Sequence, residues 1–359
     1  MLLAPAGGPA FVRLVRRLGP VFAAVGAVVA AVTWPRAFDL EAYLDAARLS
    51  AAGGDPYSAT LAAGIDDWGQ GQVFVSPPFV AHVLAPFSSL PTDVVWVLWT
   101  TASLLATGAA IRLLDRDTLV ARAPILAFSF VYLWGSLWMG QVNLFAMAGM
   151  LLAFGARTDR LAGFGLALAV VTRALPGAFA LVLLLERRWR ALAWSAVFAG
   201  LVVLVRPADW ITYFQVAREA SGLPTLPVIV QTSLAPYPPL WVAAAVAVAA
   251  VVAIGAVVER DRRLLAGTAV GFAIVLLPGN AWHHWLTFAM APLLLYGDGG
   301  AWSRATLLAL VVVSILPIGA LSAAVTIIAL VAVVAVSARG LRDEWPRIRA
   351  RGAGILGRP

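Results

Sequence analysis

Long apolar stretches, separated by short arginine-rich segments, follow one another along the whole chain. A helix needs about 20 apolar residues to cross a bilayer, and stretches of that length recur with almost no charge. They predict membrane-spanning segments near 21–33, 92–114, 123–156, 161–185, 191–206, 239–258, 266–297 and 305–338. The pattern is that of an all-α polytopic membrane protein.

Several of these stretches are interrupted by polar residues or proline, which predicts hairpins. The 34 residues of 123–156 are too long for one helix across a bilayer about 30 Å thick at about 1.5 Å per residue, and Gly140-Gln141-Val142-Asn143 supplies a turn in the middle. Stretch 266–297 breaks at Pro278, and 305–338 breaks at Pro317. Stretch 161–185 is shorter, so its arms are expected to be short or partly re-entrant. Counting every arm gives about twelve crossings, with both termini on the cytoplasmic side.

Two segments between the spans predict helices that lie on the membrane surface. In Phe38–Arg48, Leu40, Leu44 and Ala47 share one helical face, while Asp39 and Tyr43 share another. A similar amphipathic pattern covers 209–220. We therefore predict one transmembrane domain over 1–359, with a catalytic external loop at 34–91, a second external loop at 207–238 and a basic cytoplasmic tail at 339–359.

Charge supports this orientation and argues against a nucleic-acid partner. The chain is 62% hydrophobic and 12% charged, with a formal net charge of +8. Cytoplasmic loops of membrane proteins are rich in basic residues, and 21 of the 26 arginines lie in the segments assigned to that side. The segments assigned to the external side, 34–93 and 206–238, carry 9 acidic residues against 4 arginines. The basicity therefore reflects topology, and the lack of cysteine excludes disulfides and thiolate metal sites.

Arg173 is the one arginine deep inside an apolar stretch. An ionised group in a bilayer is costly, so it usually faces a polar cavity or a counter-ion. The interiors of the predicted spans offer no Asp or Glu to pair with it. A bound anion, phosphate above all, would satisfy it; the alternative is a structural role, bonding backbone carbonyls at a helix break.

Other polar residues fall on the same predicted external side as Arg173. Asp39 follows the first span, Gln141 and Asn143 occupy one hairpin tip, and His283 and His284 occupy another. Their convergence predicts an active site at the external membrane surface. Purely structural roles remain open for each of these residues. Asp39 could be an acidic residue in the first turn of a helix, Gln141 and Asn143 could stabilise the hairpin turn, and the His pair could anchor the chain at the membrane interface. Adjacent His side chains point apart and no third ligand is evident, so no metal is expected.

In this order, the motifs resemble those of glycosyltransferase family 87, over roughly residues 34–300. They are Asp39-x3-Tyr43, Gly54-Asp55-Pro56-Tyr57, Ser76-Pro77-Pro78, Gly140-Gln141-Val142-Asn143, Arg173-x2-Pro176 and Trp282-His283-His284. The resemblance implies a GT-C-type fold, a polyprenyl-phosphate-linked sugar donor and a periplasm-facing catalytic aspartate, which maps to Asp39. The family includes α-1,2-mannosyltransferases that elaborate phosphatidylinositol mannosides and lipomannan. The chain departs from the family pattern at Ser76, where Tyr is usual, and at Ala281, where an acidic residue is usual.

The resemblance leads to one chemical hypothesis for the site. Asp39 would be the general base that deprotonates an acceptor hydroxyl in an inverting transfer. Arg173, His283 and His284 would bind the donor phosphate, whose leaving group needs positive charge rather than an acid. Tyr43, Tyr57, Gln141 and Asn143 would bind substrate, although Tyr57 also fits a purely architectural role. The acceptor would be a glycolipid or lipoglycan at the outer face of the cytoplasmic membrane, and no cofactor is expected.

Three rival functions remain open at this point. A hydrolase would need a second carboxylate at about 5–10 Å, for which Glu41 or Asp45 is available. A transporter or flippase of a lipid-linked or anionic substrate would also use a buried arginine and broken helices. It would be expected to place polar groups near the midplane and on both faces, however, whereas here they gather on one. A membrane scaffold without catalytic activity is the third.

Overall fold

The computed structural model describes residues 35–64, 73–113, 130–222, 237–257 and 262–278, together with 234–235, 285, 287–288, 341–350 and scattered positions in 21–32 and 331–338. All regular secondary structure in these ranges is helical, and they contain no strand. The helices are α2 (Phe38–Ala51), α3 (Ser58–Ala63), α4 (Pro78–Leu84), α5 (Thr92–Arg112), α7 (Phe130–Trp138), α8 (Asn143–Gly155), α9 (Asp159–Thr172), α10 (Ala180–Leu185), α11 (Trp189–Val205), α12 (Pro207–Gly222), α13 (Pro238–Val257) and α14 (Arg262–Leu276), with 3-10 turns η1 (Ala85–Phe87) and η2 (Leu175–Phe179).

Helices α5 and α13 are long and apolar enough to cross a membrane. A third candidate joins α11 to α12 across a bend of 102°. These helices confirm the segments predicted at 92–114, 239–258 and 191–206. The described residues therefore carry two or three candidate spans rather than about twelve, and most of 305–338 lies outside them.

Two predicted hairpins are present as helical pairs. Helices α7 and α8 are joined at Gly140, whose φ of 71° is the left-handed conformation that glycine tolerates. Helix α9 ends at Arg173 in extended backbone, with φ −149° and ψ 120°, and the chain returns through η2 and the six residues of α10. The arms of 161–185 are thus short, as expected. The first arm of the third hairpin is α14, and its second arm lies outside the described residues.

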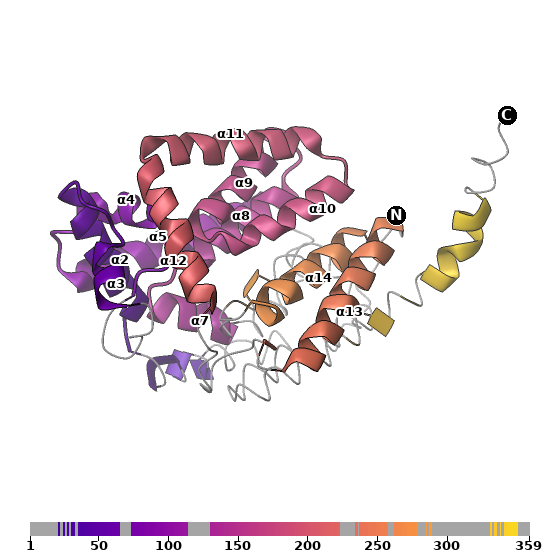
Figure 1. Cartoon of the computed structure of the whole chain (residues 1–359), viewed down its shortest axis with the longest axis horizontal. Coiled ribbons are helices and arrows are strands. Elements are labelled where there is room, and N and C mark those ends of the chain that lie inside the picture. The colour runs from indigo at the N-terminus through magenta and orange to yellow at the C-terminus, as the bar shows by residue number, and fades with distance from the viewer. Residues whose placement is uncertain are drawn as a thin grey trace.

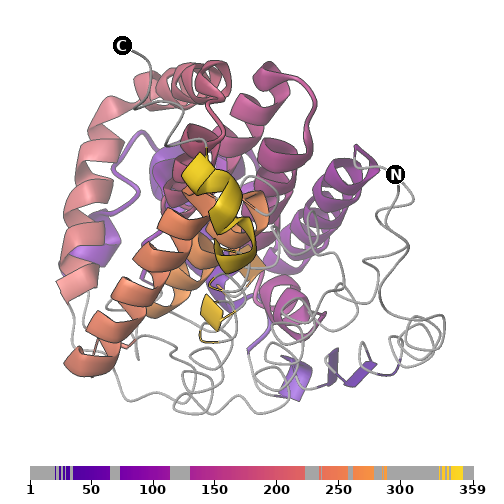
Figure 2. The same cartoon turned by 90° about the vertical axis from the view of Figure 1, so that its right-hand side faces the viewer.

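Helices α8, α9 and α11 pack side by side as a central layer (Figure 1). A Cβ on Gly149 would lie 2.5 Å from the Gly165 carbonyl oxygen, and one on Gly165 would lie 2.5 Å from the Gly149 carbonyl oxygen, so α8 and α9 meet backbone to backbone. Helices α2, α3 and α4 gather at one end of this layer, and α12 turns away from the end of α11 (Figures 1 and 2). Helices α13 and α14 pack against each other, and α14 contacts η2 and α10.

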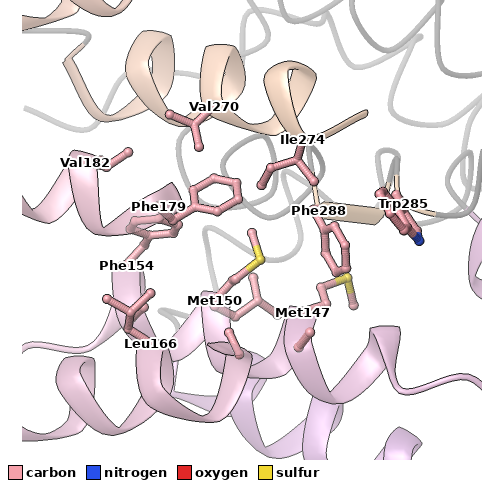
Figure 3. Packing of buried hydrophobic residues seen from close by; sticks show 14 of the residues in the cluster. Met147, Met150, Phe154, Leu166, Phe179, Val182, Val270, Ile274, Trp285 and Phe288 are labelled. Carbon is pink, nitrogen blue, oxygen red and sulfur yellow. The ribbon is translucent and has the colours of Figure 1, made fainter. Parts of the chain in front are cut away.

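An apolar cluster joins α8 to α14 and to the residues after it. Met147, Met150 and Phe154 of α8 face Phe179 of η2, Ile274 of α14 and Phe288 (Figure 3). A second cluster is built around Leu40, Leu44 and Ala47 of α2, which are all fully buried. Their burial confirms the apolar face predicted for this amphipathic helix.

Arg188 closes the end of the central layer opposite to Arg173. Its guanidinium lies 2.9 Å from an Asp159 carboxylate oxygen and donates to the carbonyls of Ala153 and Ala156 at 3.4 Å. It thereby ties the end of α8, the start of α9 and the turn after α10 together. The two segments assigned to the cytoplasm, 157–160 and 186–190, meet at this end.

Candidate active site

The start of α2 docks directly on the tip of the α7–α8 hairpin. The backbone N–H groups of Asp39 and Leu40 donate to the Met139 carbonyl at 3.0 and 3.2 Å, and that of Ala37 donates to the Trp138 carbonyl at 2.9 Å. The first N–H groups of a helix have no partner within it, so the hairpin supplies acceptors that α2 needs. This docking brings Asp39 next to Gln141.

Two backbone positions show how tightly this junction is made. A Cβ on Gly140 would lie 2.6 Å from the Leu40 Cβ, so only glycine allows α2 to approach the tip this closely. Ala37, just before α2, has φ 58°, a left-handed conformation that costs a non-glycine residue about 1–2 kcal/mol. Strain of this kind persists where the surrounding structure enforces it, and it clusters at functional sites.

Four polar side chains then form a continuous hydrogen-bonded chain. The Gln141 Nε2 donates to Asp39 Oδ2 at 2.8 Å, and the Asn143 Nδ2 donates to Gln141 Oε1 at 2.6 Å. The Arg173 Nε donates to Asn143 Oδ1 at 3.2 Å. We call this set of Asp39, Gln141, Asn143 and Arg173 the Asp39–Arg173 bridge; it links α2, the hairpin tip and the end of α9.

The bridge is buried in its middle and accessible at its ends. Gln141 is 3% exposed and Asn143 is 0% exposed, whereas Asp39 and Arg173 are both half-buried. Among the described residues, no side chain donates to Asp39 Oδ1, and no acceptor contacts the terminal nitrogens of Arg173. Each charged end therefore keeps hydrogen-bonding capacity for a ligand.

Burial raises the pKa of Asp39 above its ordinary value, because the charged form loses contact with water. The hydrogen bond from Gln141 and the charge of Arg173 act in the opposite direction and lower the pKa. A carboxylate with a raised proton affinity and a free oxygen has the properties of a general base.

Arg173 also lies against an aromatic ring. Its Cζ is 5.7 Å from the centroid of Trp285, a cation–π arrangement. Trp285 packs beside Phe288 in the apolar cluster (Figure 3), so this cluster fixes one wall of the arginine site. Within the described part of the chain, no carboxylate lies within 4.0 Å of the Arg173 guanidinium.

The two tyrosines with predicted substrate contacts lie at different depths. Tyr43 lies one turn after Asp39 on α2, and burial raises its pKa to about 12, so it is a neutral hydroxyl at physiological pH. Tyr57 is fully buried; it packs on Phe74 with ring centroids 5.1 Å apart and donates to the Ser76 carbonyl at 2.7 Å. Tyr43 therefore borders the bridge, and Tyr57 supports the layer behind it.

His283, His284 and Ala281 lie outside the described residues, so their predicted roles stay predictions. The next residue in the sequence, Trp285, is described and contacts Arg173. In the described ranges there is no group of three His, Asp or Glu side chains arranged to hold a metal ion.

A second polar cluster was not foreseen from the sequence. His82 on α4 hydrogen-bonds through Nε2 to Asp209 Oδ2 on α12 at 2.8 Å, and Arg206 Nε lies 3.1 Å from the same oxygen. His82 and Asp209 are 127 residues apart, so no local pattern signals the pair. We call His82, Arg206 and Asp209 the Asp209 cluster.

Comparison with known proteins adds one match. The profile of glycosyltransferase family 87 matches residues 74–278, which include Gln141, Asn143 and Arg173 and begin after Asp39. No curated protein and no solved structure matches the chain.

Proposed function

The chain belongs to glycosyltransferase family 87 and is a membrane glycosyltransferase, and on that premise we propose that it moves a hexose, specifically mannose, from a polyprenyl-phosphate donor to a lipid-anchored acceptor. The acceptor is a glycolipid or lipoglycan at the external face of the cytoplasmic membrane. The observation that carries this proposal is the Asp39–Arg173 bridge, which holds a carboxylate and a guanidinium in one site without pairing them directly.

Asp39 is the general base in this mechanism. Gln141 donates to Oδ2, so Oδ1 is the oxygen that takes the proton from the acceptor hydroxyl. The hydroxyl oxygen of the acceptor attacks the anomeric carbon as it loses this proton. The raised pKa favours proton uptake at this carboxylate. The sugar–phosphate bond breaks as the new glycosidic bond forms, so the configuration at the anomeric carbon inverts.

Arg173 binds the donor phosphate. Its Nε donates to Asn143, and no other described residue accepts from its two terminal nitrogens, so these two can bind two phosphate oxygens as a fork. The leaving phosphate gains negative charge as the bond breaks, and a fixed guanidinium stabilises this charge. His283 and His284, next to Trp285 in sequence, are proposed as further donors to the same phosphate.

The separation of the two charges suits an inverting transfer. The acceptor oxygen and the leaving phosphate must lie on opposite sides of the anomeric carbon, so the base and the phosphate-binding group must be apart. Two amide side chains provide that spacing. A direct Asp–Arg ion pair would instead neutralise both groups and leave neither for substrate.

The hydrolase alternative is less well supported. Asp45, one candidate for a second carboxylate, is exposed and pairs with Arg48 of its own helix. A paired-carboxylate mechanism also has no use for the arginine at the far end of the bridge. The transferase proposal accounts for both charged ends.

Sugar transfer is tested in membranes that contain the protein. We expect radiolabelled mannose to pass from polyprenyl-phosphate-mannose to extractable lipid or lipoglycan, and the same membranes with Asp39→Asn to show no transfer. Release of free mannose would indicate a hydrolase, and movement of intact donor across proteoliposomes without transfer would indicate a flippase. Either result would overturn the proposal.

Orientation is tested separately with reporter fusions. We expect cytoplasmic signals after Arg160 and Arg188, which meet at the end of the central layer opposite the bridge, and an external signal near Asp67. An external signal at Arg188 would place the bridge on the cytoplasmic side and contradict the proposed external site.

A further inference from the structure

The hydrogen bonds of the Asp39–Arg173 bridge can run in only one direction. A guanidinium only donates, and an ionised carboxylate only accepts. Because Arg173 Nε donates, Asn143 must present its carbonyl oxygen to it and its NH₂ group to Gln141. Gln141 must then present its oxygen to Asn143 and its NH₂ group to Asp39. The orientation of both amides is therefore set by the two charged ends.

Burial separates the two amides from any substrate. Asn143 is fully buried and Gln141 is 3% exposed, while the charged ends are the half-buried members. A sugar ligand needs a polar group that reaches the site surface. Instead, these two side chains hydrogen-bond to each other and to the charged ends: Gln141 donates to Asp39, and Asn143 accepts from Arg173.

We propose that Gln141 and Asn143 are positioning residues that transmit the placement of Arg173 to the carboxylate of Asp39, so that the base and the phosphate-binding arginine act as one unit. The inference rests on the proposed function for the roles of the two ends. It replaces the sequence-based prediction that the two amides contact substrate. It also implies that a donor phosphate held by the terminal nitrogens of Arg173 immobilises the bridge and thereby orients Oδ1 of Asp39 toward the acceptor.

Few groups other than the bridge act on Asp39. Among the described residues, the charged group that affects its carboxylate is Arg173, from the end of α9, and the titratable neighbour on its own helix is Tyr43. Tyr43 is neutral at physiological pH. A change in the titration of Asp39 therefore reports on the bridge.

The first test does not depend on sugar transfer. An apolar carbodiimide reacts with protonated carboxyl groups, so the pH midpoint of Asp39 labelling, followed by mass spectrometry, measures its titration. We expect Gln141→Leu to raise this midpoint by about one to two pH units, the worth of one hydrogen bond to a charged group. The isosteric variant Asn143→Asp should raise it as well, because an aspartate cannot donate to Gln141 and adds negative charge. Asp39→Asn serves as the blank.

Thr172→Val is the matched control. Thr172 is buried beside Arg173, and within the described residues its hydroxyl donates to the Leu168 and Ala169 carbonyls of its own helix alone, at 2.7 and 3.1 Å. Its loss removes a buried polar group without touching the bridge, so the labelling midpoint should not move. An unchanged midpoint in both Gln141→Leu and Asn143→Asp, or an equal shift in Thr172→Val, would overturn the inference.

The second test compares the effect of Gln141→Leu on kcat with its effect on the KM for the donor. A positioning role predicts that Gln141→Leu lowers kcat about tenfold or more, because a displaced base misses the acceptor, while the KM for the donor changes by less than about twofold. A substrate contact predicts the reverse, with a raised KM and a near-normal kcat. In a protein that already carries Asp39→Asn, adding Gln141→Leu should not lower kcat any further. If the wild type transfers no sugar, the proposed function fails, and the labelling result still decides the inference.

Discussion

Two arginine–carboxylate clusters hold opposite ends of α2, and they use the same residue types differently. Arg173 and Arg206 each follow directly after a helix, with φ of −149° and −147°. Arg173 reaches the carboxylate at the start of α2 only through two amides, whereas Arg206 contacts its carboxylate, Asp209, directly at 3.1 Å.

In the Asp209 cluster, every nitrogen of the arginine has a protein partner. Arg206 donates to the Ser50 hydroxyl at 3.1 Å and the Gly54 carbonyl at 2.9 Å, besides pairing with Asp209. Asp209 is buried and also bonds to His82. A charged group satisfied in this way holds elements together, here α12, α4 and the end of α2, and has little capacity left for a ligand.

The Asp39–Arg173 bridge leaves hydrogen-bonding capacity at both charged ends. In the part of the chain that the structure describes, Arg173 donates from one of its three nitrogens, and Asp39 accepts with one of its two oxygens. Buried polar networks are costly when left partly satisfied, so incomplete pairing at an accessible site indicates a place reserved for a ligand. The comparison therefore separates a structural arginine from a functional one by how many of its donors the protein occupies.

The largest effect is expected from Asp39→Asn, which keeps the size of the side chain and removes its basicity. Transfer should fall by about 10²–10⁴-fold, the usual contribution of a general base. Donor binding should persist, since Arg173 is intact. Activity within threefold of wild type would assign the base elsewhere, with Glu41 as the next candidate.

Arg173→Gln should weaken donor binding by roughly tenfold to a hundredfold, since a hydrogen bond to a charged group contributes about 1.5–3 kcal/mol. Arg173→Lys should lose less affinity, because it keeps the charge but not the fork. Donor affinity and melting temperature are measured on the same purified variant. Unchanged affinity with a lowered melting temperature would make Arg173 structural, like Arg206.

Gly140→Ala should impair both activity and stability. The added Cβ meets the Leu40 Cβ at 2.6 Å, and φ is 71°, so α2 must move away from the hairpin tip and carry Asp39 with it. A displacement of this order costs about tenfold to a hundredfold in turnover. Gly200→Ala, on the open surface of α11, is the control, because nothing lies within 4 Å of its added Cβ. Equal behaviour of the two variants would contradict the close docking of α2.

Asp209→Asn should lower stability without changing donor affinity. It leaves Arg206 and His82 beside a neutral side chain, and the loss of hydrogen bonds to a charged group is worth about 1.5–3 kcal/mol. Thermal unfolding and donor binding of the purified variant are the measurements. A loss of donor affinity in the folded fraction would bring the Asp209 cluster into the active site.

The last prediction concerns the pH at which kcat/KM falls on the acidic side of its profile, which has little effect on activity at neutral pH. Burial raises the pKa of Asp39, so kcat/KM should fall, as pH decreases, at a pH above the ordinary aspartate value of about 3.9. Activity falls as pH decreases because a protonated Asp39 cannot take the proton from the hydroxyl of the sugar acceptor. Arg173→Gln should move this limb to higher pH, because the arginine charge lowers the pKa. A limb that moves to lower pH would contradict the arrangement.

Local patterns in the sequence were enough to predict several helices, the hairpins and the residues proposed for the site. Apolar stretches of sufficient length predicted α5, α11 and α13, and the turn signal at Gly140 marked the junction of α7 and α8. The apolar face of α2 was readable from helical periodicity, and its members are buried. Arg173 stood out since a charge in an apolar stretch is costly wherever the stretch lies.

The hydrogen bonds between these residues could be seen only once the fold was known. Asp39 and Gln141 are 102 residues apart and Asn143 and Arg173 are 30 apart, so their hydrogen bonds depend on α2 docking at the hairpin tip and on α9 ending beside it. The sequence singled out Arg173 by its apolar surroundings and gave no indication of a role for Arg206 or of the Asp209 cluster. Hydrogen-bond occupancy is a property of three-dimensional packing, and it is what distinguishes an arginine available to a ligand from one consumed by the fold.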